Sequence, residues 1–116
     1  MVEADTELQQ LPPGEQVAMR HAVEKLRALG TTLPFPHQSS VAGGNQLREL
    51  RPRAGRSRWR ALYRQIGDAF IVGAITPEAN VDRQAFSRAI RTAEARLARY
   101  VEPGPSGGAE NGDDDR

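Results

Sequence analysis

The chain has 116 residues and a formal net charge of +1 at neutral pH, and it contains no cysteine. This length suits one small domain, and the missing thiol excludes a disulfide framework, cysteine catalysis and cysteine-ligated zinc. The longest apolar run, 69–75, is far shorter than the ~20 residues of a membrane span, and the acidic N-terminus differs from a secretory signal, so we expect a cytoplasmic protein without metal or cofactor.

The charges are unevenly distributed along the chain. Residues 1–7 carry three acidic side chains and no basic one, and residues 103–116 carry four acidic side chains and one arginine. Between them lie 15 basic and 8 acidic residues, a net charge of +7. We therefore predict a basic domain over 8–102 between two disordered acidic tails, the second rich in glycine and proline. The second tail is either a solvated appendage or a phosphate mimic that covers the basic surface.

The first predicted element is a helix over residues 13–29. Five apolar side chains recur there at helical spacing: Met19, Ala22, Val23, Leu26 and Leu29. Proline suits the start of this helix, and Gly30 suits its end. A long loop follows over 31–46, in which we expect Phe35 to anchor the backbone on the core.

Three strands are predicted next, over 47–51, 58–66 and 69–76, with a two-residue hairpin at 67–68. Alternation in the second strand places Trp59, Ala61 and Tyr63 on one face and Arg60, Leu62 and Arg64 on the other. The third strand is apolar throughout, which is typical of a strand covered on both faces. A closing helix over 82–101 completes an α+β domain: an N-terminal helix, a three-stranded antiparallel meander and a C-terminal helix packed on the sheet, with both helices on one face.

Residues 47–64 hold the chemistry-bearing charges. Seven arginines lie there against one acidic residue, Glu49; they are Arg48, Arg51, Arg53, Arg56, Arg58, Arg60 and Arg64. Like charges on neighbouring strands repel, so such a cluster favours a polyanionic ligand such as nucleic-acid phosphate. A solvated hairpin in an arginine-rich protein is the alternative. Trp59 and Tyr63 are either core residues or stacking platforms for bases.

The order of these motifs resembles a known family. A glycine-terminated helix and a Leu-Pro loop precede Leu-x-Glu-Leu-Arg at 47–51, Arg-x-x-Tyr at 60–63, an apolar strand and a closing helix. This order, over roughly 13–101, resembles the RelE/ParE superfamily of bacterial toxins, in particular its HigB-type and phage-derived toxin-like branch. The resemblance implies a RelE-like fold and the toxin of a type II toxin–antitoxin system: a ribosome-dependent mRNA endonuclease that inhibits translation without a metal. Its partners would be a cognate antitoxin, mRNA and the ribosome.

The resemblance also implies roles for individual residues. Arg60 matches the arginine that contacts the scissile phosphate, and Arg51 matches the arginine of Leu-x-Glu-Leu-Arg, which supports either the same site or the fold. The remaining arginines of the segment, Arg48, Arg53, Arg56, Arg58 and Arg64, would bind RNA backbone.

The chain departs from the family pattern in three places. Residues 76–82 lack the usual basic stretch, Phe86 stands where some relatives carry a catalytic tyrosine, and residues 1–12 lack the pattern of a first strand. The acid and base roles would then fall to Arg83, Asp82 or His37. Two alternatives follow: a catalytically degenerate RelE-fold module that binds nucleic acid or protein, and a ParE-like inhibitor of gyrase.

Overall fold

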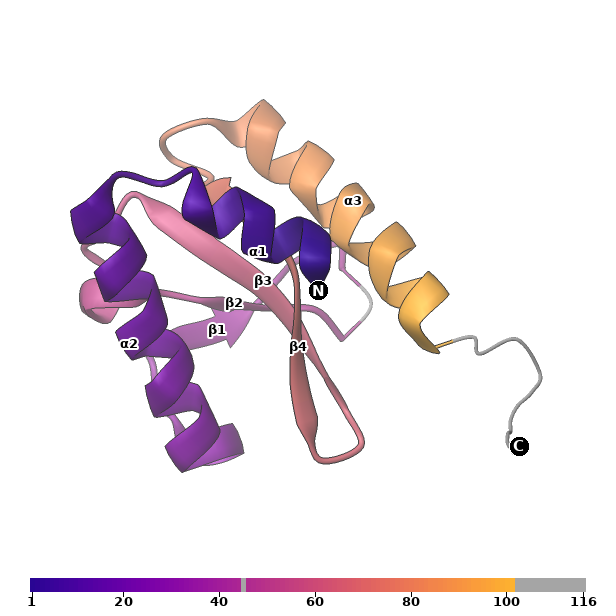
Figure 1. Cartoon of the computed structure of the whole chain (residues 1–116). Coiled ribbons are helices and arrows are strands. Elements are labelled where there is room, and N and C mark those ends of the chain that lie inside the picture. Colours follow the sequence, from indigo (N-terminus) through magenta and orange to yellow (C-terminus); the bar gives the residue numbers. More distant parts are fainter. Residues whose placement is uncertain (45, 102–116) are drawn as a thin grey trace.

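A computed structural model describes residues 1–44 and 46–101 (Figure 1), so the predicted tail at 103–116 lies outside the described residues. The elements in chain order are α1 (Val2–Gln9), α2 (Pro13–Leu29), the 3-10 turn η1 (Gly30–Thr32), β1 (Gln38–Ser40), β2 (Arg48–Leu50), the 3-10 turn η2 (Pro52–Gly55), β3 (Trp59–Ile66), β4 (Ala69–Pro77) and α3 (Arg83–Val101). The strands form one antiparallel sheet in the order β1-β2-β3-β4, so the α+β class is confirmed.

The prediction of three strands is wrong by one, because the predicted loop 31–46 contains β1. Its sequence, Gln-Ser-Ser, has no apolar alternation, and its pairing depends on contacts from other elements. Gln38 donates through Nε2 to the Leu33 carbonyl at 2.7 Å, and its Oε1 accepts from the Tyr63 hydroxyl at 3.1 Å. Burial raises the pKa of Tyr63, which keeps the phenol protonated as the donor. Tertiary contacts therefore create this strand.

The prediction of a disordered tail at residues 1–7 is also wrong, because these residues lie in α1 at the free edge of β4. The Glu7 carboxylate accepts from the Ile75 backbone N–H at 3.0 Å and from Arg96 at 3.0 Å. Arg96 in turn donates to the Gly73 carbonyl at 2.9 Å. Polar groups along a sheet edge need partners, and α1 with α3 supplies them here. The acidic side chains on which the prediction of a solvated tail was based form ion pairs with arginines of α3.

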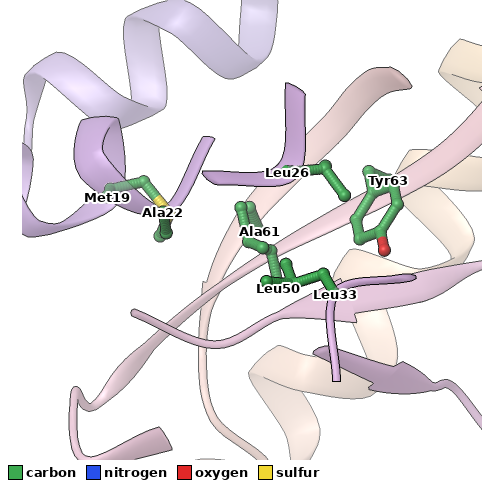
Figure 2. Close-up of a cluster of buried hydrophobic side chains, with 7 residues drawn as sticks. All are labelled: Met19, Ala22, Leu26, Leu33, Leu50, Ala61 and Tyr63. Carbon is green, nitrogen blue, oxygen red and sulfur yellow. The ribbon is translucent and has the colours of Figure 1, made fainter. Parts of the chain in front are cut away.

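The helices lie on both faces of the sheet, so the prediction that they cover one face is wrong. Figure 2 shows the cluster on the α2 side, which contains Met19, Ala22, Leu26, Leu33, Leu50, Ala61 and Tyr63. The opposite cluster joins Leu62 and Ala74 of the sheet to Ala93 and Leu97 of α3. The predicted alternation along β3 and the two-sided burial of β4 are confirmed by this arrangement. An apolar strand needs cover on each face, which two helices on one side could not provide.

A β-bulge at Gly73 sets the position of α3. Tyr63 pairs with Val72 and Leu62 pairs with Ala74, so Gly73 is the extra residue of β4. A Cβ atom at Gly73 would lie 3.1 Å from the Ala93 Cβ and 3.2 Å from the Leu97 Cδ1. The absence of a side chain here lets the helix approach the sheet closely.

Candidate functional site

Arg60 lies in the middle of a hydrogen-bond network at the end of the sheet, and its side chain is 1% exposed. Its five N–H groups donate to the carboxylates of Glu49 (3.1 Å) and Glu78 (2.5 Å) and to the backbone oxygens of Gly55 (3.3 Å), Ser57 (2.7 Å) and Trp59 (2.9 Å). A guanidinium has five donors in total. Arg60 matches the family's phosphate-binding arginine, but all of its donors are in use. It can therefore bind a phosphate only if one of these five partners is displaced.

The electrostatics of Arg60 follow from its burial. Desolvation lowers the pKa of its guanidinium, the carboxylates of Glu78 and Glu49 oppose that shift, and the positive charge of Arg51 adds to it. Arg51 and Arg60 are therefore interacting like charges, and among the described residues carboxylate partners are found for Arg60 and not for Arg51. A buried charge that loses its partner is strongly destabilising, so these two glutamates hold Arg60 in place.

The turn η2 has a left-handed backbone that Arg60 holds closed. The φ angles of Arg53 and Ala54 are 58° and 54°, a region that residues with a side chain adopt at a cost of about 1–3 kcal/mol. Gly55 follows with a φ of 90°, and its carbonyl accepts a hydrogen bond from Arg60. Arg60 thus links β3 to η2, the turn that carries Arg53.

Arg51, at the end of β2, has few partners. Its Nη1 donates to the Ser39 Oγ at 3.3 Å, and its Cζ lies 5.3 Å from the centroid of the Phe35 ring. Its Nε is buried without a hydrogen-bond partner among the described residues. Phe35 is 71% exposed, so the expectation that it anchors the loop on the core is wrong. The ring lies against the Arg51 guanidinium, whereas the neighbouring Leu33 and Gln38 are buried.

The other predicted arginines are not gathered into one cluster. Arg64 forms an ion pair with Glu94 of α3, and Arg53 lies 3.6 Å from the Glu15 carboxylate. Arg48 donates to Gln38 and Ser40, and Arg56 donates to the backbone of Arg53. Arg58 is exposed. Within residues 1–44 and 46–101, carboxylate partners are therefore found for Arg53, Arg60 and Arg64 and not for Arg48, Arg51, Arg56 or Arg58.

The three predicted acid or base candidates occupy different places. Asp82 caps α3, because its Oδ1 accepts from the Ala85 N–H at 2.9 Å. Arg83 is exposed at the first residue of that helix. His37 lies beside Arg51, whose N–H donates to the His37 carbonyl at 2.8 Å. Both residues also line a cavity of about 720 Å³ against α2, which has His21 on its opposite wall.

Two site residues were missed by reasoning from the sequence. Glu49 was noted as the one acidic residue of its segment, and Glu78 lies in a stretch described by its lack of basic residues. The register of the β3–β4 hairpin could have identified Glu78. Arg60 pairs with Thr76, and the Glu78 N–H donates to the Arg58 carbonyl at 2.7 Å. Glu78 thus lies at the same end of the sheet as Arg60. Across that part of the chain that the structure describes, no group of three His, Cys, Asp or Glu side chains is placed to hold a metal ion.

Comparison with known proteins gives one family. A family model described as phage-derived protein Gp49-like (DUF891) matches residues 6–75. The matched span begins within α1 and ends within β4. It includes η2, Arg51 and Arg60, whereas Glu78 and α3 lie beyond it. No curated protein and no solved structure matches the chain. No helix of the described ranges is long and apolar enough to cross a membrane.

Proposed function

Because the chain belongs to the phage-derived Gp49-like family, a toxin-like family of the RelE/HigB type, we propose that it is the toxin of a type II toxin–antitoxin pair that cleaves mRNA at the ribosome. The observation that carries this proposal is that Arg51, Arg56 and Arg58, which flank η2 in the chain, have no carboxylate partner among the described residues. Such guanidinium groups are suited to phosphate, which they bind through paired N–H donors. A cognate antitoxin is the second partner of the proposal.

The proposed cleavage needs no metal. The 2′-oxygen of a nucleotide attacks the adjacent phosphorus, its proton passes to a base, and the 5′-oxygen leaves and takes up a proton. Arg51 stabilises the negative charge that develops on the non-bridging oxygens of the phosphorane, because no carboxylate of the described residues pairs with it. Arg60 holds η2 and its arginines in position. Glu78, the more exposed of its two carboxylate partners, and His37 supply the proton transfers, and Arg83 extends the cationic surface at the start of α3.

Induction in a bacterial host tests the proposal. We expect growth arrest together with new mRNA 5′ ends at cleavage sites, mapped by sequencing. Arg51→Gln should relieve both effects, whereas Arg91→Gln, the same charge change at an exposed position of α3, should leave both intact. Normal growth with soluble wild-type protein present would contradict the proposal. Arg60→Ala is a poor test, because it removes the partner of two carboxylates and perturbs the fold.

A second candidate is a RelE-fold module that binds nucleic acid without cleaving it. The saturation of Arg60 by Glu49 and Glu78 favours this alternative, since the residue that matches the phosphate ligand is already occupied. The purified module would shift RNA in a salt-sensitive manner. It would release no cleavage products, even when ribosomes are added, which distinguishes it from the endonuclease.

A further inference from the structure

We propose that Phe35 and Arg51 form a subsite for one nucleotide of single-stranded RNA, with the base stacked on the ring and a phosphate bound to the guanidinium. The choice of RNA as the ligand rests on the proposed function. The subsite itself rests on the exposure of the ring, its contact with Arg51 and the unmatched donors of that arginine.

The exposure of Phe35 is the first observation. At 71%, it exceeds that of every other aromatic side chain in the described ranges, the next being Tyr100 at 53%. Pro34 and Pro36 flank Phe35 and restrict the backbone, so the ring is presented to solvent by a stiff loop. A preorganised aromatic surface loses little conformational entropy when a base stacks on it.

The charge of Arg51 is the second observation. Its guanidinium carbon lies 5.3 Å from the centroid of the Phe35 ring. Arg51 can therefore bind the phosphate of a nucleotide while Phe35 stacks on the base of the same nucleotide. Arg51 takes part in no ion pair within the described part of the chain, and its Nε has no acceptor there. A bound anion would neutralise the charge of Arg51, in the way that Glu49 and Glu78 neutralise the charge of Arg60.

The combination favours a single strand over a duplex or an acidic peptide. Bases of a duplex are stacked on each other and do not present a free face to a lone ring, whereas unpaired bases do. An acidic peptide would use the guanidinium and leave the ring without a planar partner. An exposed ring with a guanidinium over one of its faces fits the base and phosphate of one nucleotide.

Fluorescence anisotropy with a labelled uridine hexamer of RNA tests the subsite. Phe35→Ala should weaken binding about 5- to 100-fold, as expected for loss of one stacked base. Phe35→Trp should bind as tightly as the wild type, and RNA should quench its added fluorescence beyond the background from Trp59. Arg51→Gln should weaken binding and lower the salt slope by about one phosphate contact. Leu29→Ala and Arg91→Gln, an exposed apolar and an exposed basic residue elsewhere, serve as matched controls with changes below about twofold.

The outcomes separate the subsite from the proposed function. Wild-type binding that is insensitive to both Phe35→Ala and Arg51→Gln would overturn the subsite and leave the toxin proposal standing, as would a wild type that binds no hexamer yet arrests growth. A poly-glutamate decamer that competes as well as RNA would reassign the site to carboxylates. Quenching of Phe35→Trp by RNA, without any growth arrest on induction, would retain the subsite and reject the toxin.

Discussion

A guanidinium taken out of water is stable only when its charge and its donors are matched, and Arg60 meets both conditions. Two carboxylates and three carbonyls surround it. The network joins β2, β3, η2 and the residue after β4. Arg60 is therefore a structural residue first, whatever role in phosphate binding it also has.

Replacement of Arg60 by methionine should show this directly. Arg60→Met leaves Glu49 and Glu78 partly buried without their cation, so the free energy of unfolding should fall by about 3–5 kcal/mol. Urea denaturation followed by circular dichroism measures the change. The exposed Arg58→Met should stay within about 0.5 kcal/mol of the wild type. Recovery of stability in a triple variant that also carries Glu49→Gln and Glu78→Gln would assign the loss to the stranded charges; no loss in Arg60→Met would refute a structural role.

Single residues were predictable where a local rule applies and unpredictable where a distant partner decides. Alternation placed Ala61 and Leu62 on opposite faces of the sheet correctly, because the period of a strand is a local property. The partners of Arg60 depend on the registers of β2 with β3 and of β3 with β4. The second register includes a bulge that no local sequence pattern predicts. Phe35 was misplaced because burial of a large apolar side chain is the usual outcome.

At the scale of elements, the same division holds. The bounds of α2, the 67–68 hairpin, β3 and α3 follow from apolar periodicity and differ from prediction by at most a residue or two. The two missed elements, α1 and β1, have weak patterns of their own. Side-chain hydrogen bonds to other elements hold each of them: Glu7 in the first case and Gln38 in the second.

The packing of α3 on β4 should depend on the missing side chain at Gly73. Gly73→Ala places a Cβ atom 3.1 Å from the Ala93 Cβ and 3.2 Å from its Cα, so the helix must move away. We expect a loss of about 1–3 kcal/mol, the usual cost of overpacking, seen as a lower melting temperature. Gly14→Ala is the matched control, because its nearest neighbour would be an arginine tip at 3.8 Å and alanine favours a helix. A Gly73→Ala variant that melts with the wild type would show that α3 does not rest on this contact.

At the scale of the whole molecule, the acidic N-terminal helix neutralises part of the basic helix α3. Glu3 and Glu7 of α1 pair with Arg99 and Arg96 of α3. These pairs neutralise two arginines of α3. Among the described residues, no ion pair with a carboxylate is found for Arg51, Arg56 and Arg58 beside η2, nor for Arg83, Arg88 and Arg91 of α3.

Docking of α1 should weaken in acid. A backbone hydrogen bond and the Arg99 side chain lower the pKa of Glu3, so its contribution is present above the ordinary glutamate range and is lost as pH falls through the lowered value. Hydrogen exchange, expressed as protection relative to free peptide, should show α1 less protected in Glu3→Gln than in the wild type at pH 6. The two should converge as the pH falls through the lowered pKa of Glu3. Asp5→Asn, the same charge change at an exposed position of α1, is the control; equal protection of wild type and Glu3→Gln at pH 6 would exclude a role for this pair.

The position of α1 at the edge of β4 also has a consequence in time. Glu7 is separated by 68 residues from Ile75 and by 89 residues from Arg96. At a synthesis rate of about 5–20 residues per second, the helix waits roughly 4 to 18 seconds for its partners to be made. During that interval the nascent α1 has neither of these partners to dock on. When β4 is made, the helix that covers its edge is already present, and Arg96 of α3 follows 21 residues after Ile75. Completion of the sheet edge is therefore a late event in folding, because it needs contacts between the two ends of the domain.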